Sequence, residues 1–140
     1  MPLSHLKPHG ALYGMAAREE HVADAVADAA DVYGVAVLGL AGTLHERVLA
    51  RRGVAFQAES LADLDYADDG SPIITREHAE TSPETVARRV ARAVGEGRLV
   101  SIDGVELPVR VETICVHSDT PNALALVRAA RDALAGFDAA

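Results

Sequence analysis

The stretch His5-Leu6-Lys7-Pro8-His9-Gly10-Ala11-Leu12-Tyr13-Gly14 decides how the start of the chain folds. Proline fixes its own φ and pushes the residue before it toward extended geometry, so Pro8 predicts a strand that ends near Lys7 and runs into a loop. Gly10 allows a backbone shape that a side chain would disfavour. Lys7 and His9 are therefore expected at the carboxyl end of a strand, where it runs into a loop. They are either a solvated cation and a turn-capping imidazole, or part of a functional site.

Helical and extended patterns alternate after this stretch. The apolar runs at residues 35–38, 54–58 and 113–117 predict strands, and the first and last of them are apolar enough to be buried on both faces. Together with the first strand they make four. Strands joined through helices by short loops form right-handed βαβ units, so we expect an α/β fold with a parallel sheet or barrel.

Four helices are expected between and after these strands. The first covers residues 15–33 and ends at Gly34. Capping signals open the others: a capping box at 43–46 for a helix to about residue 52, Ser82-Pro83, and Thr120-Pro121. The residues expected to form the buried stripes are Val22, Ala25 or Val26, Ala29 and Tyr33, then Val86, Val90 and Val94, then Leu124, Val127 and Leu134.

Two segments interrupt the alternation. Residues 98–112 alternate around Asp103-Gly104, which predicts a β-hairpin. Residues 60–82 are rich in acidic side chains around Tyr66, which is typical of a solvated loop. A lid or a cation site are the alternatives, although the spacing is not that of an EF-hand.

Composition narrows the class of protein. The chain has 140 residues, 49% hydrophobic and 24% charged, which is ordinary for one globular domain with a real core. A net charge of −8 argues against nucleic acid and anionic membranes as partners. One cysteine excludes an internal disulfide, and no apolar run is long enough to span a bilayer. We therefore expect a soluble, cytoplasmic protein.

Polar side chains follow the predicted strands at their carboxyl ends. In parallel α/β folds the loops after the strands gather on one face, where sites are built. The candidate site residues placed there are Lys7, His9, Glu59, Asp63, His117 and Asp119. The shared position of these residues, rather than any one of them, predicts a functional site.

Other chemistry is less supported. His117 and Asp119 precede a helix N-terminus, and a helix N-terminus favours the binding of an anion. Asp119 would repel an anion unless it orients His117 or binds a proton or metal. Asp119 could also be a simple helix cap. Cys115 is expected to be a small buried hydrophobe. The turn at 39–42 lacks the phosphate-loop pattern, and no close pair of metal ligands occurs. His21, His45 and His78 are expected to be solvated.

Four segments resemble the LamB/YcsF family, in order and over nearly the whole chain. They are His5–Tyr13, Gly39-Leu40-Ala41-Gly42, Glu59-Ser60-Leu61-Ala62-Asp63 with Tyr66 and Asp69-Gly70, and the run from Ile114 to Ala123. The first and last of these motifs are specific to the family. The resemblance implies α/β architecture with parallel β/α units of an incomplete seven-stranded β/α barrel, of the glycoside hydrolase/deacetylase type. It also implies that residues 1–140 are a single domain corresponding to the family's C-terminal part, without its N-terminal portion.

The resemblance further implies a function: ATP-dependent opening of the lactam 5-oxoproline to L-glutamate, together with 5-oxoprolinase subunits B and C. ATP would be bound with or by those subunits, and the chain would act as a cyclic amide hydrolase once the N-terminal motifs are supplied. Lys7 would hold the substrate carboxylate or an oxyanion, the two histidines would handle protons, and the acidic residues would orient them. The alternatives are a non-catalytic scaffold or partner-binding remnant of that complex and, on fold analogy alone, a metal-dependent deacetylase-like hydrolase.

The number of strands leads to one further expectation. About four parallel strands cannot close a barrel, because even small barrels need roughly eight strands to fill their interior. At least one sheet edge should therefore expose unpaired backbone groups. We expect the chain to self-associate, most simply as a two-fold dimer joined near the N-terminal strand, or to need a partner that supplies strands. The alternative is that the hairpin or the acidic segment covers the edge.

Overall fold

The computed structural model describes residues 2–75 and 80–137 of the chain. These residues form two compact units, which divide between Glu59 and Ser60. The expectation of a single domain over 1–140 stays a prediction. His78 and part of the acidic segment lie outside the described residues. No described helix is long and apolar enough to cross a membrane.

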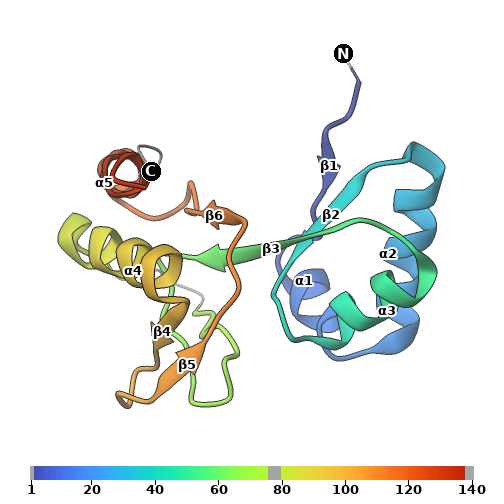
Figure 1. The fold of residues 1–140 in the computed structure, drawn as a ribbon, viewed down its shortest axis with the longest axis horizontal. Helices are drawn as coiled ribbons and strands as arrows, with labels where there is room; N and C mark the ends of the chain where they lie inside the picture. Colours follow the sequence, from blue (N-terminus) through green and yellow to red (C-terminus); the bar gives the residue numbers. More distant parts are fainter. Residues whose placement is uncertain (1, 76–79, 138–140) are drawn as a thin grey trace. The chain divides into compact units, whose positions relative to one another are not determined.

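The first unit contains two of the four strands expected from the sequence and the start of a third (Figure 1). Its elements are β1 (His5–Leu6), α1 (Ala11–Ala16), α2 (Glu20–Tyr33), β2 (Ala36–Gly39), α3 (Leu44–Arg52) and the start of β3 (Phe56–Leu61). Strand β2 pairs in parallel with β1 on one side and with β3 on the other, with Val37 opposite both Leu6 and Phe56. Because each connection between these parallel strands contains a helix, the unit consists of βα repeats.

The core of the first unit is built from small side chains. Ala27 and Ala30 of α2 pack with Val37 and Leu49, and all four are 1% exposed or less. The alanines let the helix lie close to the strand, so the unit needs few aromatic residues. Burial of this apolar surface holds α2 and α3 against β2.

Two glycines are needed by the local geometry of this unit. Gly10 has φ 55°, a left-handed value that lets the chain turn from β1 into α1. At Gly39 an added Cβ would lie 2.9 Å from both His45 Nδ1 and the Phe56 ring. The end of β2 therefore has room for a hydrogen atom only.

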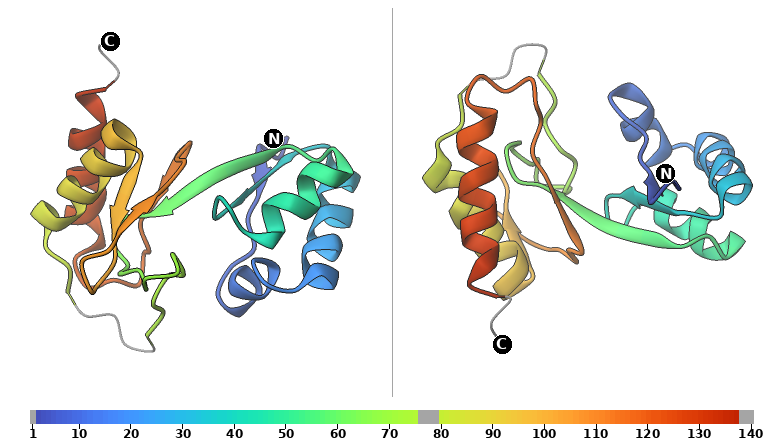
Figure 2. Two further views of the ribbon diagram at one scale, coloured as in Figure 1. Left: turned by 60° about the horizontal axis from the view of Figure 1, so that its bottom comes forward. Right: turned by 90° about the horizontal axis from the view of Figure 1, so that it is seen from above.

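The second unit contains α4 (Pro83–Glu96), β4 (Arg98–Val100), β5 (Glu106–Pro108), β6 (Thr113–Cys115) and α5 (Ala123–Ala135). Helices α4 and α5 lie side by side in both views of Figure 2. Their contact buries Val86, Val90, Leu126 and Ala130, with Ala62 in the same cluster. Strand β6 neighbours the end of β3, and Ala62 N donates a hydrogen bond to the Cys115 carbonyl.

The predicted hairpin and several helix ends are confirmed. Strands β4 and β5 pair antiparallel, with Leu99 opposite Leu107, on either side of Asp103-Gly104. Helices α2 and α3 end at Gly34 and Gly53. Ser82 caps α4, because its side chain accepts a hydrogen bond from Thr85 N.

Two predicted caps are wrong. Thr43 stands at the N-cap of α3, but its hydroxyl donates to the Leu40 carbonyl, and Glu46 accepts from Gly42 N, so no capping box forms. Helix α5 begins at Ala123 with Asn122 at its N-cap, later in the chain than Thr120 would place it. Short polar side chains bond to whichever nearby backbone or side-chain group the fold presents, and this overrides the local pattern.

The predicted helix faces are also partly wrong. The helix expected over 15–33 is two helices, and α2 buries Ala23, Ala27 and Ala30 beside Val22 while Tyr33 is 60% exposed. Val94 is 36% exposed, and Leu124 and Val127 of α5 lie outside while Leu126 is buried. The apolar pattern places large residues inward, but alanines fill the close contacts here. Likewise β6, expected to be fully buried, is half-buried.

His45 and the acidic segment correct two further expectations of solvent exposure. His45 is 2% exposed, because it shares one face of α3 with the buried Val48 and Leu49. Residues 61–64 and Tyr66 are buried, so the start of the acidic segment belongs to the core of the second unit. Residues 67–75, with the turn at Gly70, are half-buried or exposed, as is typical of a surface loop.

Candidate functional site

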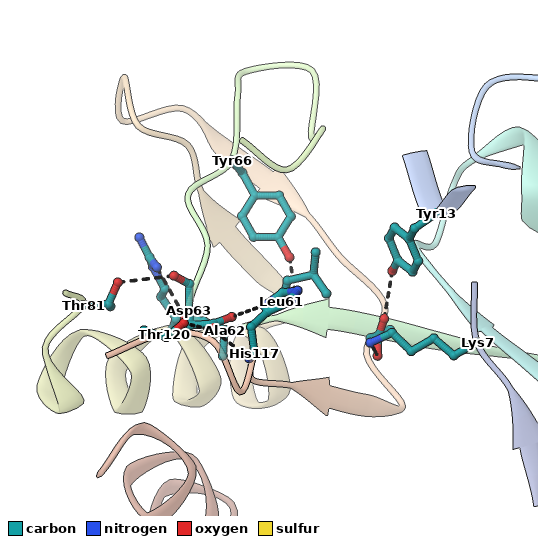
Figure 3. Close-up of polar contacts among 11 residues, drawn as sticks. Lys7, Tyr13, Leu61, Ala62, Asp63, Tyr66, Thr81, His117 and Thr120 are labelled. Carbon is teal, nitrogen blue, oxygen red and sulfur yellow. Dashed lines mark hydrogen bonds and ion pairs between the residues drawn. The ribbon is translucent and has the colours of Figure 1, made fainter. Parts of the chain in front are cut away.

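The first group of candidate residues surrounds Glu59 and is called here the lysine cluster: Lys7, Tyr13 and Glu59. Glu59 lies in β3 and is 3% exposed. Lys7 Nζ donates to Glu59 Oε1 at 2.6 Å, and the Tyr13 hydroxyl donates to Oε2 at 2.9 Å (Figure 3). The lysine comes from the loop after β1 and the tyrosine from α1, so three separate segments of the first unit meet at one carboxylate.

This arrangement holds a charge pair away from water. The Lys7 ammonium also lies 5.8 Å from the centre of the Tyr13 ring, within the range of a cation–π contact. A buried carboxylate is stable only when it is paired and hydrogen-bonded, and here both of its oxygens accept a bond from a named donor. The cluster therefore fixes the position of the lysine ammonium.

The second group is the histidine cluster, which consists of Asp63, His117 and Thr120 in the second unit. Asp63 follows the end of β3, and its side chain has no exposed surface. Its Oδ1 is 2.9 Å from His117 Nδ1, while Oδ2 accepts from His117 N at 2.7 Å and from Thr120 Oγ1 at 3.2 Å (Figure 3). The carboxylate thus fixes both the backbone and the ring of His117.

The geometry defines what the imidazole can do. An ionised carboxylate only accepts hydrogen bonds, so His117 Nδ1 must be the donor toward Asp63. In such an arrangement the other ring nitrogen of a histidine can exchange a proton, and the carboxylate stabilises an imidazolium. The His117 side chain is 32% exposed, so the ring is accessible although its partner is buried. This is a carboxylate-oriented histidine suited to general acid–base chemistry.

The remaining candidates are not in either cluster. His9 is exposed and makes no hydrogen bond or ion pair with any residue that the structure describes. Asp119 is exposed in the turn before α5. Cys115, expected to be buried, is half-buried. Across residues 2–75 and 80–137, no group of three or more histidine, cysteine or acidic side chains could hold a metal ion.

Sequence reasoning did not place Tyr13 and Thr120 in the site. Tyr13 lies within the opening motif, in the loop expected before the helix over 15–33, where no role is expected for a tyrosine side chain. The local pattern makes Thr120 a helix cap, whereas its hydroxyl bonds to Asp63. The signal available for both is the same: each lies within a few residues of a candidate, on a segment that follows a predicted parallel strand.

The fold and these two clusters define the chain as an α/β protein with parallel strands and paired polar residues at and beyond the strand ends. Comparison with known sequences agrees, since the LamB/YcsF family matches residues 1–139. The chain belongs to the LamB/YcsF family.

Individual proteins are also similar to this chain in sequence. The 5-oxoprolinase A subunit of Thermus thermophilus is 39% identical over 138 residues, which cover 96% of this chain and 55% of that protein. The protein of the same name from Mycobacterium leprae is 40% identical over 142 residues, 97% of this chain and 56% of that protein. The chain therefore spans about half the length of the curated relatives it matches.

A solved structure is also similar to this chain in its fold. The crystal structure of the lactam utilization protein from a second strain of Thermus thermophilus is similar with a TM-score of 0.85 and 35% sequence identity. The match covers 99% of this chain and 56% of that one. The expected α/β fold class with parallel β/α units is confirmed.

Proposed function

We propose that this chain acts as the A subunit of an ATP-dependent 5-oxoprolinase, in the opening of 5-oxoproline to L-glutamate. One observation carries the proposal: the family's motif residues pair across distant positions of the sequence, Lys7 with Glu59 and Asp63 with His117. The names of the relatives support the substrate class.

The chemistry of a lactam explains why such groups are needed. A lactam is an unreactive amide, so its opening requires activation of the carbonyl and a positioned water or phosphoryl donor. We assign to Lys7 the binding of the substrate carboxylate or of a developing oxyanion. We assign proton transfer to His117 with Asp63 as its orienting partner, and the positioning of the ammonium to Glu59. His9 and Asp119 are proposed as further contributors from their exposed loops.

The proposal includes other components. ATP would be bound with or by 5-oxoprolinase subunits B and C, and the complex would be cytoplasmic. Hydrolysis of the cyclic amide is the proposed overall reaction. The alternative is a partner-binding scaffold, which predicts stable association with those subunits and no turnover.

Turnover distinguishes these two functions. The chain is mixed with subunits B and C, ATP and 5-oxoproline, and released glutamate is measured. His117→Ala should lower the rate by about 10²- to 10⁴-fold, the usual contribution of general acid–base catalysis. Asp63→Asn and Lys7→Ala should also lower it, while His21→Ala, at a side chain that is 80% exposed, serves as the matched control. Association without any glutamate release would favour the scaffold, and an unchanged rate in His117→Ala would refute the assigned role.

We also propose that the chain self-associates or takes up strands from a partner. Strand β1 has only two residues and, within the described part of the chain, it pairs with β2 alone, so its other side is a sheet edge. Leu3, just before β1, is 54% exposed. Light scattering across a range of concentrations tests this, and a concentration-independent monomer that unfolds cooperatively would contradict it.

A further inference from the structure

A hollow lined by arginines lies in the second unit, and none of its lining residues belongs to either cluster described above. One wall is a face of α4, where Thr85, Arg88, Arg89 and Arg92 follow the three- and four-residue spacing of a single helix face. The other wall is residues 98–102, which begin with β4, and Asp65 completes the lining. The hollow has a volume of about 350 Å³, within the range of small-ligand sites.

Four guanidinium groups line this hollow, and one carboxylate, that of Asp65, lines it with them. Asp65 pairs with Arg89. Glu106, which lies outside the lining, accepts from Arg92 at 2.7 Å and from Arg98 at 3.0 Å, and Glu96 accepts from Arg92 at 3.2 Å. Asp68 accepts from the lining residue Ser101 at 2.6 Å. The carboxylates at and around the hollow therefore equal its arginines in number, and what the hollow offers an anion depends on which arginines they pair with.

Arg88 differs from the other three arginines. Its Nη2 donates to Thr85 Oγ1 at 3.2 Å, and no ion pair joins it to any residue within 2–75 or 80–137. A guanidinium carries five N–H donors, so this one contact uses a small part of its capacity. Arg88 thus supplies charge and directed donors to the hollow that the described chain does not neutralise.

We propose that this hollow binds a small phosphorylated organic molecule, with its phosphate on the arginines. A phosphate carries up to two charges and several acceptor oxygens, and forked guanidinium donors bind such a group in a bidentate manner. The chain as a whole carries −8, so attraction of an anion must come from this local group of cations. Leu99, Val100 and Ile102 provide an apolar wall beside the arginines for the organic part.

Two ligands test the two walls of the hollow: inorganic phosphate for the arginines, and phenyl phosphate for the arginines and the apolar wall together. Binding of inorganic phosphate and of phenyl phosphate to the full chain is measured by isothermal titration calorimetry at low ionic strength. Phenyl phosphate should bind more tightly than inorganic phosphate, because it adds contact with the apolar wall. Arg88→Gln should weaken both ligands by about tenfold, the loss expected when one charge-assisted hydrogen bond is removed. Ile102→Ser, at a side chain that is 62% exposed, should weaken phenyl phosphate alone.

Arg128→Gln is the matched control, since Arg128 is an exposed arginine of α5 outside the hollow. Circular dichroism confirms that each variant retains the wild-type fold. The proposal fails if neither phosphate binds saturably, if Arg128→Gln weakens binding as much as Arg88→Gln, or if a polyglutamate peptide binds at the hollow while the phosphates do not. The test measures binding only, so its outcome is independent of whether the chain opens lactams.

Discussion

The two units hold their buried carboxylates in different ways. In the lysine cluster both charged partners are shielded, with side-chain exposures of 14% for Lys7 and 3% for Glu59. In the histidine cluster the carboxylate of Asp63 is fully shielded, but its partner His117 is 32% exposed. The first arrangement stabilises a fixed charge, whereas the second leaves an oriented ring within reach of solvent. Both carboxylates are paired and buried, so the two clusters are distinguished by how exposed the partner of the carboxylate is.

The largest effect is expected when the lysine of the first cluster is removed. Lys7→Met leaves the Glu59 carboxylate buried without its ion-pair partner, and removing one partner of a buried pair costs about 3–5 kcal/mol of unfolding free energy. The double variant with Glu59→Gln should recover much of that loss, because no buried charge remains. Urea unfolding with amide exchange followed for residues 2–59 measures both, and Arg47→Met, at a position outside the cluster, is the control. A Lys7→Met variant as stable as the control would show that the pair is not a stabilising feature.

A smaller change tests whether Tyr13 completes the lysine cluster. Tyr13→Phe removes the donor to Glu59 Oε2 and keeps the ring, so the expected loss is about 1.5–3 kcal/mol, as for hydrogen bonds to charged groups. The same unfolding measurement applies. Tyr33→Phe, whose parent side chain is 60% exposed in the same unit, should leave stability unchanged.

The units should also differ in how pH acts on them, because the first unit contains a buried histidine outside its cluster. Burial lowers the pKa of His45 below its ordinary value of 6.5. The unfolded chain then binds this proton at a higher pH than the folded chain, so stability falls as pH drops through 6.5 and the loss is complete below the folded pKa. For one proton the slope is at most about 1.4 kcal/mol per pH unit.

His45→Leu should remove this part of the acid dependence. Unfolding free energies of the wild type and the variant are compared from about pH 8 to about pH 5, the range around the unperturbed histidine pKa, with exposed His21→Leu as the control. Equal slopes in the wild type and His45→Leu would mean that the ring takes up its proton as readily in the folded chain as in the unfolded one.

The smallest expected effect concerns the histidine cluster. Thr120 supplies the longest of three hydrogen bonds to Asp63, 3.2 Å, and shares Oδ2 with His117 N at 2.7 Å. Thr120→Val should therefore cost only about 1 kcal/mol and leave the ring of His117 in place. Turnover of the variant with subunits B and C should stay within a few-fold of the wild type. A loss as large as that of His117→Ala would show that the hydroxyl itself takes part in the reaction.

Much of the order of elements was predictable from the sequence, for a physical reason. Apolar runs such as 35–38 and glycine stops such as Gly34 report local backbone preference, which the fold respects. The carboxyl ends of parallel strands meet at one edge, so the segment of Lys7 could be expected near that of Glu59.

What failed were assignments that depend on distant packing. A polar histidine is expected on the surface, but α3 turns the face of His45 toward Gly39 and Phe56. The apolar pattern predicts Leu124 inside, whereas the contact between α4 and α5 selects Leu126 and Ala130. When a helix carries alanines and leucines on more than one face, the local sequence pattern does not predict which face packs against another helix.

Lys7 is the only lysine in the chain, so its ion pair with Glu59 has a practical consequence. Amine-directed acylating reagents attack an accessible, uncharged amine, and apart from the α-amino group they have one target here. Lys7 is 14% exposed and paired with Glu59, so acylation at this position requires the ammonium to leave the carboxylate, as it does in local openings of the first unit. The rate of acylation at Lys7 therefore reports how often its ammonium leaves the Glu59 carboxylate. This measurement of local opening needs no added label.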